Sequence, residues 1–136
     1  MIFLDANFLL AFFIETEKGH KTATNIYEKI KNEGLIISNS IILEVMTVSN
    51  IKLKVSKDVL ETIYSKLNDG TFKIVEDVPL YDMAMKRQIS YLPERIPFLD
   101  CLYLELMKQL GIEKIATFDK HFKNKGVEVI QTVKNL

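Results

Sequence analysis

The sequence contains little of the residue types that build several kinds of site. It has a single cysteine, Cys101, which excludes a disulfide framework within the chain and any cysteine-rich zinc site. Its two histidines argue against a metal site built from histidines. Excess charge is lacking as well, since 18 basic residues balance 18 acidic ones. This balance excludes a protein that coats nucleic acid through overall positive charge, although it is compatible with a local basic rim.

Long apolar runs are also absent. The longest early run, from Phe8 to Ile14, is too short to span a bilayer and is bounded by Asp5 and Glu15. The first basic side chain is Lys18, so the positive lead-in of a secretory signal is missing. We therefore expect a soluble, cytoplasmic protein without a membrane partner.

The composition that remains is that of an ordinary globular protein. Apolar residues make up 48% and charged residues 26% of the 136 positions. A length of this size suits one domain, residues 1–136, and is short for two. The high apolar content and the zero net charge argue against disorder.

Short apolar runs alternate with amphipathic stretches along the chain. The runs predict five strands and the stretches predict six helices. The strands are expected at residues 2–4, 35–38, 72–78, 114–117 and 127–130, and the helices at 7–14, 20–33, 40–53, 56–68, 79–91 and 98–110. This alternation predicts an α/β fold, a three-layer α/β/α sandwich around a five-stranded, mainly parallel sheet.

Four acidic residues occupy places where such sheets bind ligands, which is outside the carboxyl ends of the strands. Asp5 directly follows the first strand, and Asp119 comes two residues after the fourth. Glu44 lies in the helix after the second strand, and Asp100 begins the helix that leads into the fourth. Three of them have a simpler alternative. Asp5 and Asp119 suit helix caps, and Asp100 suits the first turn of a helix, where the dipole favours an acid.

Glu44 is the most informative of the four. If Ser40 caps the helix, a capping box needs an acid three residues later, and Glu44 comes four residues later. On a helical wheel, Ile41, Val48 and Ile51 form one apolar stripe that includes Glu44. A carboxylate in an apolar stripe is costly unless it is paired. The alternative explanations are a buried salt bridge and a helix tilted at its first turn.

Carboxylates that converge at one edge of the sheet need a cation. At an effective dielectric of about 20, two unit charges about 4 Å apart repel by about 4 kcal/mol. Oxygen-only ligands select hard ions such as Mg²⁺ or Mn²⁺. The chemistry that uses such ions beside a polyanion is phosphoester cleavage, in which the ion lowers the pKa of the attacking water.

Four short motifs with these acids appear in order along the chain. They are Ile2-Phe3-Leu4-Asp5-Ala6-Asn7, then Ser40-Ile41-Ile42-Leu43-Glu44, then Phe98-Leu99-Asp100-Cys101, and finally Gly111-Ile112 leading to Ala116-Thr117-Phe118-Asp119-Lys120-His121-Phe122. With these motifs the whole chain resembles the PIN domain, and more specifically the VapC-like toxin ribonucleases of prokaryotic toxin–antitoxin pairs.

The resemblance implies a ribonuclease that cleaves single-stranded RNA with the help of Mg²⁺ or Mn²⁺. The family's four catalytic and metal-binding acids correspond to Asp5, Glu44, Asp100 and Asp119. Asn7 and Thr117 match polar positions that support these carboxylates or the attacking water, and Ser40 matches the helix start before Glu44. Such toxins usually form homodimers and are neutralised by a small antitoxin, which inserts a C-terminal segment near the acidic pocket.

The chain departs from the family pattern at two places. Tyr103 and Leu104 stand where small residues are common, which concerns packing or dimer contacts more than chemistry. Ala6 stands where a hydroxyl residue is common, so a supporting hydroxyl is expected to be missing. Cys101 is expected to be a small packing residue, because no histidine is placed to activate it.

The residues after Asp119 are interpreted more simply. His121 is expected to be a passive loop residue, with contact to a phosphate as the alternative. Lys120, Lys123 and Lys125 are interpreted as a solvated charged loop, with a basic rim that steers RNA as the alternative.

Other functions are compatible with parts of the pattern. A toxin and a stand-alone PIN-domain nuclease of RNA processing fit the residues equally well. A non-catalytic PIN-like binding domain would have no need of four mutually repelling acids. A receiver-like domain needs a second acid next to Asp5 and a lysine after the fifth strand, and both are missing. A phosphatase with a nucleophilic aspartate needs another aspartate where this chain has Asn7.

Overall fold

The chain folds around one parallel β-sheet. The computed structural model describes the backbone of residues 1–136 and the side chains of residues 1–134 and 136. The sheet consists of β1 (Ile2–Leu4), β2 (Leu35–Ser38), β3 (Lys73–Val75), β4 (Lys114–Ala116) and β5 (Glu128–Ile130). The strand order is β3-β2-β1-β4-β5, and every neighbouring pair is parallel.

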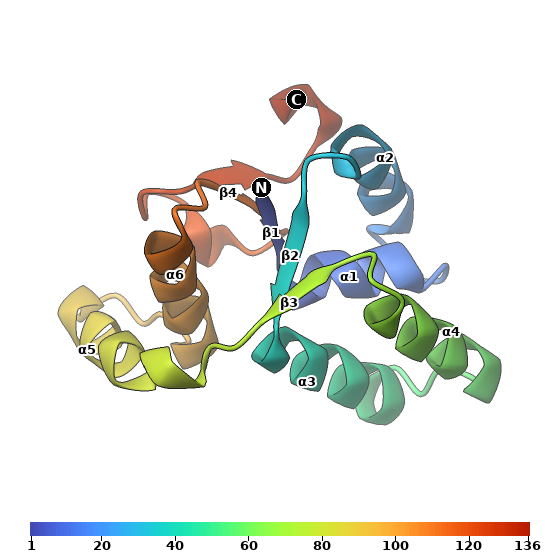
Figure 1. Ribbon diagram of the computed structural model, residues 1–136, viewed down its shortest axis with the longest axis horizontal. Coiled ribbons are helices and arrows are strands. Elements are labelled where there is room, and N and C mark those ends of the chain that lie inside the picture. The colour runs from blue at the N-terminus through green and yellow to red at the C-terminus, as the bar shows by residue number, and fades with distance from the viewer.

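Six α-helices cover the two faces of the sheet in the part of the chain that the structure describes. They are α1 (Ala6–Phe13), α2 (His20–Ile30), α3 (Asn39–Thr47), α4 (Lys57–Asn68), α5 (Tyr81–Tyr91) and α6 (Phe98–Leu110). In Figure 1, α1 to α4 lie on one side of the sheet, and α5 and α6 lie on the other. The predicted three-layer α/β fold with five strands is confirmed, and the sheet is parallel throughout.

The central strands are buried because helices cover both of their faces. All three residues of β1 are inaccessible to solvent, as are Ile37 of β2 and Ile115 of β4. A strand buried on both sides needs a continuous apolar run and not an alternating one, which explains the sequence Ile-Phe-Leu of β1. Each such side chain contributes roughly 1.5–3 kcal/mol by leaving water.

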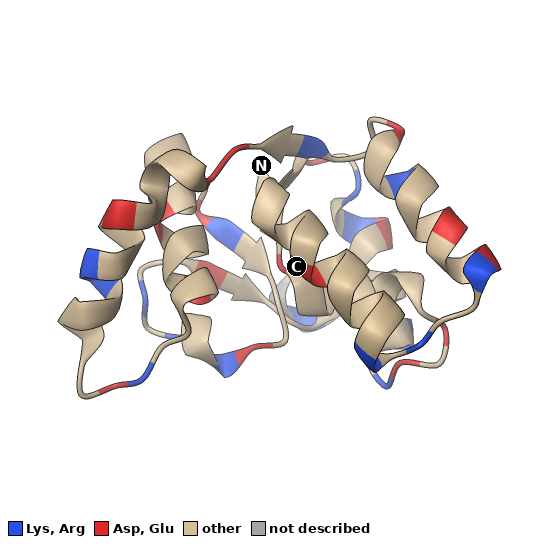
Figure 2. Ribbon diagram, turned by 90° about the horizontal axis from the view of Figure 1, so that it is seen from below, with Lys and Arg blue, Asp and Glu red and all other residues tan. Residues whose placement is uncertain are grey.

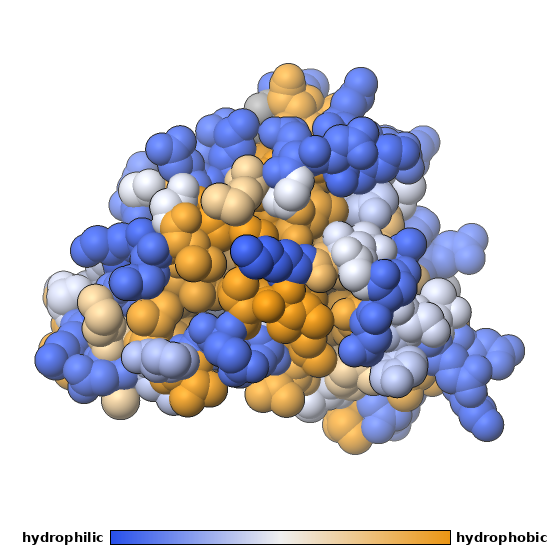
Figure 3. All heavy atoms as spheres, in the orientation of Figure 1, coloured by the Kyte–Doolittle hydropathy of each residue, from blue (hydrophilic) through white to orange (hydrophobic). Residues whose placement is uncertain are grey.

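The edge strand β3 is more exposed than the others. Figure 3 shows hydrophobic residues in the middle of this face of the molecule, with hydrophilic residues around them. Ile74 of β3 is 43% exposed, and its neighbour Lys73 is exposed as well. A short edge strand that carries a lysine discourages pairing with another chain.

The strand order places a reversal of direction between β1 and β4. From β1 the chain moves to β2 and β3, and it then returns past β1 to β4 and β5. At the carboxyl ends of β1 and β4, Leu4 pairs with Ala116, and the backbone N–H of Asp5 donates to the carbonyl of Ala116 at 3.1 Å. A reversal of this kind opens a crevice between the two following segments, where ligands bind in α/β proteins.

A π-helical turn, Val48–Lys52, follows α3. Its N–H to C=O bonds span five residues, as from Leu53 to the carbonyl of Val48, so the following side chains are rotated relative to an α-helix. Ser49 is therefore buried, and Ile51 is 67% exposed. The prediction that Ile51 belongs to the buried stripe is wrong for this reason, whereas the wholly buried Ile41 confirms the start of the stripe.

Other boundaries differ from the predicted ones by a few residues. The predicted helix 40–53 is α-helical only as far as Thr47, and the predicted helix 20–33 ends at Ile30. The third strand is limited to residues 73–75, because a 3₁₀ turn at 78–80 begins soon after it. The predicted helix 98–110 and the strand 35–38 are confirmed with their bounds.

The helices α5 and α6 are held together by an ion pair with little exposure to solvent. The Arg87 guanidinium donates to Glu105 at 2.8 Å and to the Tyr91 hydroxyl at 2.7 Å. Cys101 is fully buried beside Ala84 and Leu102 in the small core between these helices, which confirms its expected packing role. This pairing holds α5 against α6, the helix that carries Asp100.

Charged side chains are distributed widely over the molecule. Figure 2 shows Lys and Arg on helices and loops at both ends of the view, interspersed with Asp and Glu. Within the described residues, none of the helices has the length and apolar character that crossing a membrane requires.

The altered register after α3 can be tested by substitution. Ile51→Ala should lower the free energy of unfolding by no more than about 0.5 kcal/mol, because the side chain is exposed. Ile41→Ala should lower it by about 2–5 kcal/mol, because the change leaves a cavity in the core. Urea denaturation of both variants checks this. A loss above about 2 kcal/mol for Ile51→Ala would place that side chain in the core.

Candidate active site

Asp5 caps α1 at the carboxyl end of β1. Its Oδ1 accepts the backbone N–H of Ala6 at 2.8 Å, and its Oδ2 accepts the Thr117 hydroxyl at 2.7 Å. The side chain is nearly buried, at 4% exposure. The cap and the candidate site are therefore compatible, because one oxygen serves the helix and the other faces the segment after β4.

Asn7 and Thr117 connect the segments that follow β1 and β4. The Asn7 side-chain amide donates to Asp5 Oδ2 at 3.3 Å, and its carbonyl oxygen accepts the backbone N–H of Phe118 at 3.0 Å. The Thr117 hydroxyl also accepts the backbone N–H of Asp119 at 3.0 Å. These neutral groups fix the position of Asp5 relative to the segment that leads to Asp119.

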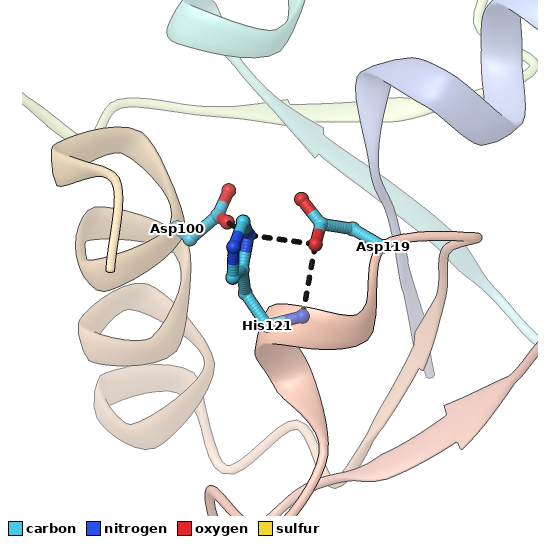
Figure 4. Close-up of side chains that lie close together, drawn as sticks. All are labelled: Asp100, Asp119 and His121. Carbon is cyan, nitrogen blue, oxygen red and sulfur yellow. Dashed lines mark hydrogen bonds and ion pairs between the residues drawn. The ribbon is translucent and has the colours of Figure 1, made fainter. Parts of the chain in front are cut away.

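Asp100, Asp119 and His121 form a compact cluster (Figure 4). Nδ1 of His121 lies 2.7 Å from Asp119 Oδ1 and 3.2 Å from Asp100 Oδ2. One ligand atom from each of the three residues lies within 4.8 Å of the others. Asp119 also accepts the backbone N–H of His121 at 2.8 Å, so it caps the short 3₁₀ helix 120–122 as well.

The contacts of His121 with the acids are not predictable from the sequence. The sequence predicts a loop residue without a function, whereas the structure places the His121 ring between Asp100 and Asp119. The only signal in the sequence is its position two residues after Asp119. Its contact with Asp100 spans 21 residues and depends on how α6 docks on the sheet.

Glu44 is held by a tyrosine. The hydroxyl of Tyr103 donates to Glu44 Oε1, and the Tyr103 ring is fully buried against Phe3 of β1, with ring centroids 5.3 Å apart. In the described part of the chain, neither Lys nor Arg pairs with Glu44, so a buried salt bridge does not explain its position. Tyr103, expected to concern packing or dimer contacts, therefore also orients an acid.

Three of the acids, Asp5, Glu44 and Asp100, have raised pKa values, first because they are buried and next because other carboxylates lie near them. Burial, and next the charges of Glu44 and Asp119, raises the pKa of Asp5 to about 7, against the opposing hydrogen bond from Thr117. Burial, and then the charges of Asp5, Asp119 and Glu44, raises the pKa of Asp100 to about 8. Burial and the charge of Asp119 also raise the pKa of Glu44, although its bond with Tyr103 lowers it. The structure thus brings all four side chains within reach of each other's charge.

Ser40 lies apart from this cluster. Its hydroxyl donates to the buried carboxylate of Asp77 at 2.9 Å, while Asn39 accepts the backbone N–H of Asp77 at 2.8 Å. The residue at the cap of α3 is Ser38, two positions before the expected Ser40. Ser40 therefore joins α3 to the segment before α5, and its hydroxyl donates to Asp77 instead of one of the four acids.

The lysines after Asp119 differ from one another. Lys120 and Lys123 are exposed, as expected of a solvated loop. The Lys125 side chain is only 7% exposed, because its Nζ pairs with Glu94 at 3.0 Å and lies over the Tyr91 ring. Lys125 therefore joins the loop to the α5 end of the molecule and does not contribute to a solvated rim.

The donor set of the cluster suits a divalent cation. It offers carboxylate oxygens that repel one another and that are oriented by neutral donors from Thr117, Asn7 and Tyr103. Hard cations such as Mg²⁺ and Mn²⁺ prefer such oxygen ligands. Bound there, an ion would offset the mutual repulsion that, together with the larger effect of burial, raises the pKa values of Asp5 and Asp100.

Comparisons with known proteins find similarity along nearly the whole chain. The family model described as PIN domain matches residues 2–128. A protein of Aquifex aeolicus (strain VF5) called VapC ribonuclease is 29% identical over 133 residues, which is 96% of both chains.

Two solved structures share the fold. VapC20 of Mycobacterium tuberculosis, described as a sarcin–ricin loop cleaving toxin, has a TM-score of 0.83 and 20% identity, covering 93% of this chain and 96% of that one. VapBC2 of Rickettsia felis, solved with a DNA fragment from its promoter, has a TM-score of 0.68 and 18% identity, covering 96% of this chain and 98% of that one. At these identities the likeness concerns the fold.

The raised pKa values predict a particular dependence of stability on pH. In the metal-free protein, Asp5 and Asp100 keep protons up to pKa values of about 7 and 8, whereas the unfolded chain releases them near 3.8. The stability contributed by these protons is complete below the unfolded pKa and is lost as the pH rises through the folded values.

Asp100→Asn removes one of these charges. Measured by urea denaturation in EDTA, it should stabilise the protein relative to wild type by about 1 kcal/mol or more at about pH 8, with a smaller gain at about pH 5. The control is Asp58→Asn, which replaces an exposed acid in the first turn of α4. Its free energy of unfolding should differ from that of wild type by the same amount at both pH values. A gain for Asp100→Asn that does not change with pH would contradict the charged cluster.

Proposed function

This chain belongs to the PIN domain family, and we propose that it is a divalent-metal-dependent endoribonuclease that hydrolyses RNA phosphodiester bonds. The observation that carries the proposal is the convergence of Asp5, Glu44, Asp100 and Asp119 at the crevice between β1 and β4, with pKa values raised for the first three. A charged cluster of this kind destabilises the fold unless it serves to bind a cation.

We assign the four carboxylates to the binding of Mg²⁺ or Mn²⁺ and to catalysis. When bound, the ion would lower the pKa of the attacking water and offset negative charge on the phosphate. Thr117 and Asn7 fix the direction of Asp5, and Tyr103 fixes Glu44, so that these carboxylates are preorganised for the reaction. We assign Ser40 an indirect role in catalysis, because its hydrogen bond with Asp77 positions the start of α3, the helix that carries Glu44.

The comparisons support a more specific proposal. The protein from Aquifex aeolicus is called a VapC ribonuclease, and the structure from Mycobacterium tuberculosis is described as a toxin that cleaves the sarcin–ricin loop. We therefore propose that this chain is the toxin of a type II toxin–antitoxin system and that it acts on RNA in the cytoplasm. As partners we propose a small antitoxin protein and a second copy of this chain, as expected for the VapC-like toxins that the sequence resembles.

A non-catalytic binding domain is the main competing proposal. Such a domain gains nothing from carboxylates held at raised pKa values in a crevice. A stand-alone PIN-domain nuclease would use the same residues. The gene next to this one distinguishes it from a toxin, because a small neighbouring reading frame with a DNA-binding N-terminus supports the toxin.

The catalytic proposal predicts loss of RNA cleavage when one carboxylate is neutralised. Asp5→Asn should reduce Mn²⁺-dependent cleavage of a single-stranded RNA by about 100-fold or more, since a group that orients the ion and the water is lost. Gel analysis of a labelled RNA measures the rate, and circular dichroism checks that the variant is folded. EDTA should stop cleavage by the native protein.

Asp58→Asn is the matched control, because this exposed acid lies on α4 away from the cluster. It should cleave RNA at the native rate. Full activity of purified, folded Asp5→Asn, or activity of the native protein in EDTA, would refute the proposed metal-dependent mechanism.

A further inference from the structure

We propose that His121 contributes a nitrogen ligand to the ion held by Asp100 and Asp119, and that the site therefore prefers a divalent transition ion such as Mn²⁺ over Mg²⁺. The inference rests on the proposed metal-dependent function, which it makes more specific. It adds a histidine to the four carboxylates and predicts a choice between two ions.

The distances in the cluster suit ligands of one ion. His121 Nδ1 lies 2.7 Å from Asp119 Oδ1 and 3.2 Å from Asp100 Oδ2 (Figure 4). An octahedral ion with bonds of about 2.1 Å has neighbouring ligand atoms about 3 Å apart. The nitrogen is therefore already spaced from each of the two oxygens as an adjacent ligand, and one ligand atom of each residue lies within 4.8 Å of the others.

The position of the imidazole is fixed by its own short helix. The backbone N–H of His121 donates to Asp119 Oδ1 at 2.8 Å within the 3₁₀ helix 120–122. The next residue, Phe122, is fully buried and anchors this helix in the core. The His121 side chain is 31% exposed, so the ring lies at the mouth of the cluster and is accessible to an ion from solvent.

The chemistry of imidazole sets the expected preference. Imidazole nitrogen is a favourable ligand for first-row transition ions, whereas Mg²⁺ prefers oxygen and keeps several of its waters. A site of carboxylates alone accepts both Mg²⁺ and Mn²⁺. Replacing one oxygen position by nitrogen shifts the balance towards Mn²⁺.

The other histidine of the chain provides a matched control. Nδ1 of His20 is engaged with the backbone carbonyl of Ala11 at 2.8 Å, at the start of α2. Within the described residues, its ring nitrogen contacts this carbonyl and not one of the four acids. Its replacement removes the same ring from the protein without changing the cluster.

The alternative is that the imidazole occupies the place of the ion and competes with it. The two roles predict opposite results when the ring is removed. A ligand that is lost weakens binding of Mn²⁺, whereas a competitor that is lost strengthens binding of both ions.

Two measurements on the full chain distinguish these roles. Calorimetric titration with MnCl₂ and with MgCl₂ should show that His121→Ala weakens Mn²⁺ binding by about tenfold or more, with a change of no more than about threefold for Mg²⁺. Pulsed electron paramagnetic resonance of the Mn²⁺-loaded protein should show coupling to a nitrogen nucleus. The coupling should persist in His20→Ala and vanish in His121→Ala.

The outcomes separate this inference from the proposed function. Mn²⁺ binding and RNA cleavage without nitrogen coupling would overturn the role of His121 alone. Unchanged or tighter Mn²⁺ binding by His121→Ala would overturn it as well. A native protein that binds neither ion and cleaves RNA in EDTA would overturn both the inference and the metal-dependent function.

Discussion

Repulsion among four carboxylates is the constraint around which this structure is organised. The strand order β3-β2-β1-β4-β5 turns back between β1 and β4, and Asp5 and Asp119 follow these two strands. The helix after β2 adds Glu44, and the helix before β4 adds Asp100. The topology therefore gathers acids from distant parts of the chain, and burial together with their mutual charge raises the pKa of Asp5 and Asp100 to about 7 and 8.

The groups that orient these acids carry no positive charge of their own. Thr117, Asn7 and the buried Tyr103 are neutral donors. Elsewhere the chain treats a poorly exposed acid differently, since Glu105 is paired directly with Arg87 at 2.8 Å. Within the described residues, the only basic side chain in ion-pair distance of the four acids is His121. The cluster is thus preorganised, and its carboxyl groups are free to give up their protons to a cation, which is the property that a metal-dependent nuclease requires.

Much of the fold was predictable from local sequence, whereas parts of the site were not. The continuous apolar run of β1 and the bounds of α6 are confirmed, because burial on two faces and a glycine after the helix leave clear patterns. The π-helical turn after α3 left no such pattern, so Ile51 was wrongly placed in the core. The four acids could be selected because Asp5 and Asp119 follow strands, whereas Glu44 and Asp100 lie on helices that adjoin strands. The roles of His121 and Tyr103 could not be predicted in this way. His121 contacts Asp100, which is 21 residues away in the sequence, and Tyr103 contacts Glu44, which is 59 residues away. Both contacts form only when α6 docks on the sheet.

The central claim is that the convergent acids form one site for a divalent ion. Anomalous X-ray diffraction from crystals soaked in Mn²⁺ tests it most directly, because the ion is located independently of any activity. The account predicts a strong anomalous peak in the crevice between β1 and β4, bounded by Asp5, Asp100 and Asp119. Well-diffracting crystals in saturating Mn²⁺ with no peak among these carboxylates, or with a peak only at another place on the surface, would contradict it.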